Sequence, residues 1–193
     1  QHSEMFPLVN QDKPNRLDLF QIWINLPARN KMTEPGYEMI WAHEVPHIQI
    51  EGGDVRVISG SWNEHVAPSA PGASWANNPE NEVALYILTI KAGSSVELPT
   101  ASSMANRMMY HIDGGSAFVE SSELKPKYGM ELRADASTTV QANDSDVRVL
   151  ILQGRPIAEP VAQHGPFVMN TRAEIHQAFD DYRRTQFGGW PWG

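Results

Sequence analysis

Residues 163–174 read QHGPFVMNTRAE, and they join a Gly-Pro turn directly to a well-signalled helix start. The Thr171 hydroxyl can accept a hydrogen bond from a backbone N–H of the first turn, while Glu174 reaches back to complete a capping box. An apolar stripe at helical spacing follows, made of Ile175, Ala178, Phe179 and Tyr182. The pattern predicts a helix that begins near Thr171, packs its apolar face against a sheet and stops at Gly188-Gly189.

The bulk composition favours an all-β protein. Of the 193 residues 41% are hydrophobic, including 6 Trp, 6 Phe and 5 Tyr, which is ordinary for a globular chain able to bury a core. The sequence also contains 14 Pro and 14 Gly, which indicates many turns.

The charge balance limits the classes of partner. With 15 Lys plus Arg against 23 Asp plus Glu, the formal charge is −8, which argues against direct binding of nucleic acid phosphates. The absence of Cys excludes disulfides and thiolate metal sites and fits a reducing compartment. No apolar run approaches the roughly 20 residues that cross a bilayer, and no signal peptide is visible. We therefore expect a soluble, cytoplasmic protein with no membrane contact.

Short strand-like runs separated by turns fill the middle of the chain. His47–Ile50 and Val55–Ile58 are predicted to form a hairpin around the turn EGGD at 51–54. Met108–Ile112 is expected to meet Ala117–Val119 across the turn DGG at 113–115. The remaining runs are Val83–Ile90 and Val147–Leu152. Such spacing predicts a sandwich or a barrel, and a jelly-roll cupin barrel fits.

The first third of the chain is less regular. The run from Arg16 to Leu26 is apolar on both faces and bounded by prolines, which predicts a buried strand. Residues 28–46 have mixed polarity and no sustained period, so we interpret them as a connection between domains, with a boundary near Glu44. Residues 61–80 are predicted to form a long polar loop.

Several ordered segments together resemble the pirin family, whose members join two cupin barrels in one chain. The matching segments are HSEM at 2–5, LFQIWINLP at 19–27, Lys31-Met32 with Pro35 and Tyr37, GRPIAEPV at 154–161, and the stretch at 163–174. The resemblance implies an all-β fold, namely the second cupin or jelly-roll barrel of a bicupin followed by a C-terminal α-helix. It divides the chain into a remnant of the first cupin domain with a linker at 1–44, the second barrel at 45–162, and a tail with the helix at 163–193.

The resemblance also implies a metal site. Pirins bind a metal, usually iron, in the first barrel through a His-x-His pair and a later His-x-Glu pair, and His2-Ser3-Glu4 matches the second pair. On a strand, positions i and i+2 point to one face, so His2 and Glu4 can converge on one ion. This sequence contains no His-x-His, so half of the site is missing. We expect iron or another divalent metal in the intact first domain, and a truncated chain that is inactive alone.

Three other histidine positions have structural interpretations. The sequence HEVPH at 43–47 spells the zinc-protease pattern, but Pro46 disrupts the helix that the pattern needs. His111 could line the second barrel, yet no nearby ligand accompanies it, and pirins leave this barrel without metal. His164 is expected to position the tail. No catalytic residue is assigned.

Two function hypotheses follow from the resemblance. The first is a metal-dependent dioxygenase that cleaves flavonols such as quercetin, with a small aromatic substrate as partner. The alternative is a non-catalytic, metal-binding regulatory protein that acts through protein partners, as a transcription cofactor or a regulator of metabolic enzymes. A third possibility is that the chain is an inert cleavage product.

Overall fold

The computed structural model describes residues 8–188. The chain forms two compact units. One unit combines the two ends of the chain, up to Pro35 and from Glu159 onward, and the other runs from Gly36 to Ala158. The predicted domains at 1–44, 45–162 and 163–193 stay a prediction.

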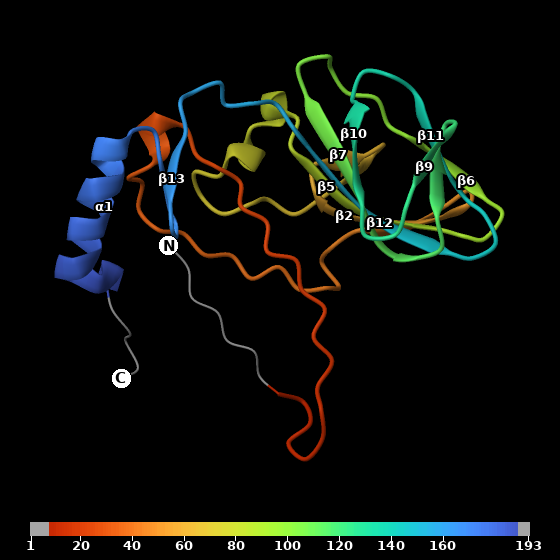
Figure 1. Cartoon of the computed structure of the whole chain (residues 1–193), viewed down its shortest axis with the longest axis horizontal. Helices are drawn as coiled ribbons and strands as arrows, with labels where there is room; N and C mark the ends of the chain where they lie inside the picture. Colours follow the sequence, from red (N-terminus) through yellow and green to blue (C-terminus); the bar gives the residue numbers. More distant parts are fainter. Residues whose placement is uncertain (1–7, 189–193) are drawn as a thin grey trace. The chain divides into compact units, whose positions relative to one another are not determined.

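The larger unit contains a six-stranded antiparallel sheet (Figure 1). In spatial order its strands are β1 (His47–Ile50), β2 (Gly53–Ser59), β5 (Ala84–Ile90), β12 (Val147–Gly154), β7 (Asn106–Gly114) and β10 (Gly129–Arg133). The predicted hairpin is confirmed, because β1 pairs with β2 through partners such as Ile48 and Val55. The glycines of its turn supply the conformational freedom, and Gly52 has a φ of 83°.

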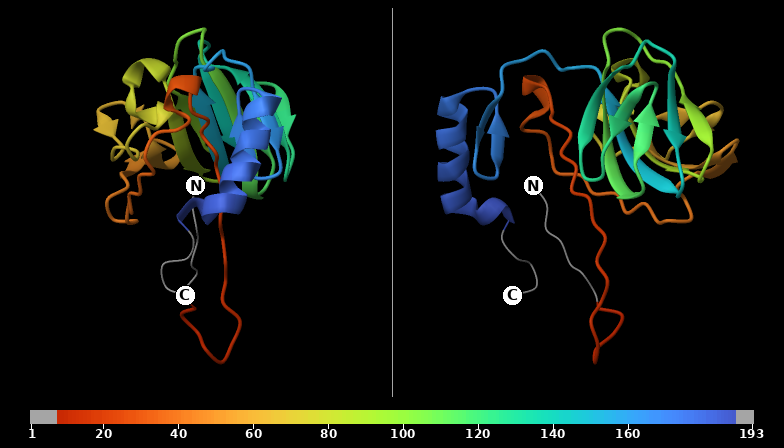
Figure 2. Two further views of the ribbon diagram at one scale, coloured as in Figure 1. Left: turned by 90° about the vertical axis from the view of Figure 1, so that its left-hand side faces the viewer. Right: turned by 45° about the vertical axis from the view of Figure 1, so that its right-hand side comes forward.

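A second sheet of four strands belongs to the same unit, and Figure 2 shows it from another side. Its strands, in spatial order, are β6 (Ser95–Leu98), β11 (Thr138–Ala142), β8 (Ala117–Val119) and β9 (Ser122–Leu124). The loop between β2 and β5 contains the short pair β3 (Ser61–Trp62) and β4 (His65–Val66), and the 3-10 turns η2 (Trp75–Asn77) and η3 (Pro79–Asn81).

The two sheets share one apolar core. Alternation along the strands sends every second side chain inward, as in β2, where Val55 and Val57 are fully buried. The core also includes Leu88 of β5 and Met109 of β7 from the large sheet, and Val140 of β11 from the small one. This arrangement confirms the predicted all-β cupin fold with a C-terminal helix, built as two packed sheets.

The predicted pairing of Met108–Ile112 with Ala117–Val119 is wrong. The first run lies in β7, which pairs with β10 and β12, whereas the second forms β8, which pairs with β9 and β11 in the other sheet. The glycine turn carries the chain from one sheet to the other instead of closing a hairpin. Gly114 has a φ of 94° and sits so close to the Asp146 carbonyl that a Cβ would lie 2.0 Å from its oxygen.

The predicted buried strand at Arg16–Leu26 is also wrong. These residues form no strand in the part of the chain that the structure describes, and Leu17, Phe20 and Trp23 expose 67%, 43% and 51% of their surface. An apolar run predicts burial, but a strand exists only where a neighbouring strand completes its hydrogen bonds.

The smaller unit contains the helix that the sequence predicts. Strands β13 (Ala162–His164) and β14 (Phe167–Met169) form a hairpin, and α1 (Arg172–Thr185) packs against it. The capping box is confirmed: the Glu174 N–H donates to the Thr171 hydroxyl at 3.2 Å, and the Thr171 N–H donates to the Glu174 carboxylate at 2.7 Å. Ile175 of the predicted stripe is buried. The helix ends before Gly188, because Gln186 adopts the left-handed conformation that closes it at the start of η4 (Gln186–Gly188).

Polar contacts join the two ends of the chain within this unit. The Glu159 carboxylate accepts hydrogen bonds from the backbone N–H of Ala28, at the start of η1 (Ala28–Asn30), and from the Asn170 amide at 3.1 Å. Lys31 donates to the Leu26 carbonyl at 2.6 Å. Burial lowers the pKa of Lys31, and the nearby Glu159 carboxylate partly offsets that effect. The segment near Ala28 is thus tied to the C-terminal tail.

Candidate functional site

The predicted metal ligands His2 and Glu4 lie outside the described residues, so their role stays a prediction. Within residues 8–188, no group of three or more His, Cys, Asp or Glu side chains is arranged to hold a metal ion. The described side chains therefore do not supply a complete metal site by themselves.

The HEVPH sequence at 43–47 is not helical. His43 and Glu44 lie in a turn, and His47 begins β1. The His47 ring contacts the Asp54 carboxylate at 2.7 Å across the β1–β2 hairpin. The two imidazoles of the sequence pattern therefore do not have the one-turn helical spacing that a zinc protease requires, as predicted.

His111 and His164 occupy different environments. His111 lies on β7, 7% exposed, and its Nε2 is 2.7 Å from the Gly115 carbonyl oxygen. His164 ends β13, and its ring packs edge-on against Phe179 of α1 with 5.6 Å between ring centroids. This contact holds the hairpin against the helix, which agrees with the predicted positioning role of His164.

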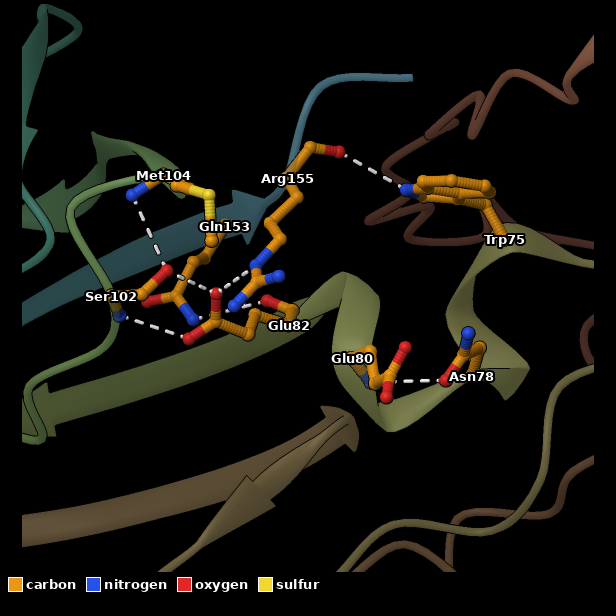
Figure 3. A network of polar contacts seen from close by, with 8 residues as sticks. All are labelled: Trp75, Asn78, Glu80, Glu82, Ser102, Met104, Gln153 and Arg155. Carbon is orange, nitrogen blue, oxygen red and sulfur yellow. Dashed lines mark hydrogen bonds and ion pairs between the residues drawn. The ribbon is translucent and has the colours of Figure 1, made fainter. Parts of the chain in front are cut away.

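A network of polar side chains centred on Glu82 lies within the larger unit (Figure 3). Glu82 follows η3 and has a φ of 50°, a left-handed conformation that is rare outside glycine. Its carboxylate accepts hydrogen bonds from the Ser102 N–H at 2.9 Å, from the Ser102 hydroxyl, and from Arg155 Nε at 2.5 Å. Its backbone carbonyl accepts a bond from the Gln153 amide at 3.0 Å. Glu82 therefore connects the β2–β5 loop to the loop before β7 and to the end of β12.

These contacts favour the ionised form of Glu82. Burial alone would raise the pKa of its carboxyl, but the hydrogen bonds from Ser102 and Arg155 outweigh burial and hold the pKa below its ordinary value. A carboxylate with a lowered pKa is a poor general base at neutral pH. The Glu82 network is therefore suited to fixing the geometry of these loops rather than to moving a proton.

The same network continues through Trp75. Its indole Nε1 donates to the Arg155 backbone carbonyl at 3.0 Å, and the Arg155 N–H donates to the Asn81 carbonyl at 2.8 Å. The Asn81 side-chain amide in turn donates a hydrogen bond to the Trp75 backbone carbonyl at 2.7 Å. This ring of contacts anchors the loop that the sequence showed only as polar.

Gln153 links the network to the buried Arg107. The Gln153 side-chain oxygen accepts hydrogen bonds from Nε of Arg107 at 2.9 Å and from its Nη2 at 2.5 Å. Neither residue was selected from the sequence. One signal was available: with alternation along residues 107–111, Arg107 shares a face with the apolar Met109 and with His111, which would have indicated that it is buried.

The fold and the site define a class: this is a cupin-type double-sheet protein with a polar network at one end of its strands. A profile of the family described as "Pirin C-terminal cupin domain" matches residues 85–188, which is more than half of the chain. The chain therefore belongs to the pirin family.

Named relatives agree with this assignment. The chain is 38% identical to a pirin-like protein of Caulobacter vibrioides, over 96% of this chain and 63% of the relative. It is 31% identical to Pirin-1 of Arabidopsis thaliana, over 87% of this chain and 57% of the relative. The chain thus spans about three fifths of the length of these relatives.

A solved structure has a similar fold. The crystal structure of quercetin 2,3-dioxygenase from Acinetobacter baumannii superimposes with a TM-score of 0.74 at 28% identity, over 86% of this chain and 55% of that one. In residues 8–188 of the present structure, no helix combines the length and the apolar character that a membrane span requires.

Proposed function

We propose that this chain is part of a cytoplasmic pirin that, when intact, acts as a metal-dependent dioxygenase on flavonols of the quercetin type. The observation that carries the proposal is the similarity to the solved quercetin 2,3-dioxygenase, which extends over most of this chain. Membership of the pirin family supports it. A small aromatic substrate is the partner that this activity implies.

In this proposal His2 and Glu4 are two ligands of an iron ion, and the remaining ligands come from the intact first domain. An imidazole and a carboxylate suit a divalent transition metal, and an open coordination position would let it bind a substrate hydroxyl close to dioxygen. The described residues support the terminal unit. Glu159 and Asn170 hold the segment around Ala28 against the C-terminal tail, which fixes the chain that follows the His2–Glu4 pair.

Oxygen uptake with quercetin tests the proposal on full-length protein reconstituted with iron. Wild type is expected to consume dioxygen, and Glu4→Ala is expected to lose most of that rate because one charged ligand is gone. Glu80→Ala is the matched control, since this exposed glutamate lies in the other unit and should leave the rate unchanged. Absence of quercetin-dependent uptake above the Glu4→Ala background would refute the activity. Equal losses in both variants would refute the ligand role of Glu4.

A further inference from the structure

The large sheet of the larger unit ends at β10, and one side of this strand has no neighbouring strand. In spatial order β10 is the last of the six strands, and within the described chain it pairs with β7 alone. Its residues alternate between exposed and half-buried positions, and the side chain of Arg133 is 79% exposed. An edge strand presents a row of unpaired N–H and C=O groups, which can pair with another extended chain.

The pairing with β7 determines which backbone groups of β10 point outward. The His111 N–H donates to the Tyr128 carbonyl at 2.9 Å, so these two residues form a hydrogen-bonded pair of the antiparallel ladder. Such pairs recur at every second residue. The even-numbered residues of β10 therefore bond to β7, whereas the backbone groups of Gly129, Glu131 and Arg133 point to the outer side.

The two faces of β10 differ in chemical character. Met130 and Leu132 are half-buried and pack against the apolar core. Glu131 and Arg133 lie on the opposite face and are exposed, because side chains alternate along a strand. The strand therefore carries an apolar row on one face and two opposite charges on the other, and a strand added at this edge has to match both.

A second copy of β10 matches both faces in one antiparallel register. If Leu132 lies opposite Leu132 of the second copy, Glu131 lies opposite Arg133 on each side of the two-fold axis. Opposite charges then meet twice, and these same residues supply the outward backbone groups that form hydrogen-bonded pairs. The two leucines form the non-hydrogen-bonded pair between them, where side chains approach most closely and apolar surface is covered.

Other registers of the same pairing are less favourable. Centring the pair on Glu131 places two glutamates opposite each other, and centring it on Arg133 places two arginines opposite each other. Like charges directly opposite each other are destabilising. The charges on β10 therefore select the register centred on Leu132.

A simpler role for the two charges is to keep edge strands apart, which is a common protection. The other edge of the sheet fits that description better: β1 has four residues, follows Pro46 and carries no acidic residue. In contrast, β10 is a regular run of five residues with no proline and no bulge in its pairing with β7. Its charges repel a strand in other registers but attract a second β10.

We propose that this edge is a dimer interface, at which the β10 strands of two copies of the chain pair antiparallel about a two-fold axis at Leu132. The dimer joins two large sheets into one continuous sheet. Asp135 contacts Nε and Nη2 of Arg133 at 3.2 and 3.0 Å, which leaves Nη1 for Glu131 of the second copy. The contact extends over one short strand, so association is weak compared with stable interfaces that bury roughly 1,200–2,000 Å². The interface is independent of the proposed dioxygenase activity.

Sedimentation velocity of the chain, from micromolar to near-millimolar concentration, tests the proposal. Wild type should change from monomer to dimer as the concentration rises. Glu131→Lys puts a lysine opposite Arg133 twice, and Arg133→Glu puts a glutamate opposite Glu131 twice. Each substitution should raise the dissociation constant at least about tenfold, because two attractive pairs become repulsive.

An equimolar mixture of these two variants is the decisive sample. In the mixed dimer every lysine or arginine lies opposite a glutamate, so the mixture should associate at concentrations where each variant alone is monomeric. Glu64→Lys is the matched control, since it changes the net charge by the same amount and its 81% exposed side chain lies between β3 and β4. It should dimerise as wild type does. A mixture that stays monomeric, or an equal loss in Glu64→Lys, would overturn the proposal.

Hydrogen exchange of wild type locates the interface without any substitution. As the concentration rises, the amides of Glu131 and Arg133 should exchange more slowly, because their outward N–H groups become hydrogen-bonded. The amide of Gln49 on β1, at the opposite edge of the sheet, should keep its exchange rate. A wild type that stays monomeric at every concentration, or a dimer without added protection at Glu131 and Arg133, would show that β10 does not pair with itself.

Discussion

The two compact units of this chain are stabilised in different ways. The unit from Gly36 to Ala158 has an apolar core supplied by both of its sheets, whereas in the unit formed by the chain ends the helix buries one residue, Ile175. The second unit depends instead on half-buried aromatic rings, such as Phe167 against Phe179 with 4.7 Å between centroids, and on polar contacts at Glu159. We infer from this difference that the sheet unit carries most of the stability. The terminal unit is held by a few contacts, each of which can be removed by a single substitution.

The largest effect is expected from a cavity in the sheet core. Leu88 lies on β5, fully buried, and pairs with Val55 and Val149 on either side. Leu88→Ala should lower the free energy of unfolding by about 3–5 kcal/mol, because the cavity adds to the lost burial. Urea unfolding followed by circular dichroism measures it.

Leu19→Ala is the matched control for that experiment. Leu19 lies in the segment wrongly predicted to be a buried strand, and it is 51% exposed. Its loss should change the stability by less than about 0.5 kcal/mol. A large effect at Leu19 would mean that this segment is packed in solution, and the contrast between the units would fail.

A smaller and more local effect is expected at Ile175. Ile175→Ala removes the one buried side chain of α1 and should cost about 2–3 kcal/mol, mainly by allowing the helix to open. Hydrogen exchange should therefore accelerate in α1 while the amides of β5 keep their protection. Equal acceleration in both elements would show that the two units unfold together.

A substitution in the polar network tests whether the stability of the sheet unit also depends on charge. Because the folded-state pKa of Glu82 is lowered, its contribution to stability is fully present above the ordinary glutamate pKa and is lost as the pH falls through the folded value. Glu82→Gln should cost about 1–2 kcal/mol at pH 7 and less in acid. Unfolding midpoints measured between neutral and acidic pH check this.

Glu80→Gln provides the comparison for Glu82. Glu80 is exposed two residues earlier in the same loop, and its backbone N–H, rather than its carboxylate, makes the contact with Asn78. Its substitution should leave the pH dependence of stability as in wild type. If both variants lose the same pH-dependent part of the stability, that part does not come from the hydrogen bonds of Glu82 with Ser102 and Arg155.

The sequence predicted features that depend on neighbouring residues. The β1–β2 turn, the alternation in β2 and the capping box of α1 each lie within a few residues, so local rules suffice. The errors involve distant partners. Nothing near Ala117 indicates that β8 joins β11, and nothing near Arg16 indicates whether a neighbouring strand is present. The Glu82 and Arg107 contacts were missed for the same reason, since Arg155 lies 73 residues from Glu82 and Gln153 lies 46 from Arg107.

The smallest effect is expected at the helix start, where the sequence alone gave the right geometry. Thr171→Ala removes the hydroxyl that accepts the Glu174 N–H and should cost about 1 kcal/mol, the usual value for losing an N-cap. Thr171→Ser keeps the hydroxyl and should restore most of the loss. Hydrogen exchange in the first turn of α1 measures both.

Because the Glu174 carboxylate also accepts the Asn170 N–H at 3.0 Å, and Asn170 contacts Glu159, opening of this turn should spread to the segment around Ala28. If exchange rises in the first turn but not at Ala28, the cap and the tie between the chain ends are independent, and the terminal unit is less cooperative than its contacts indicate.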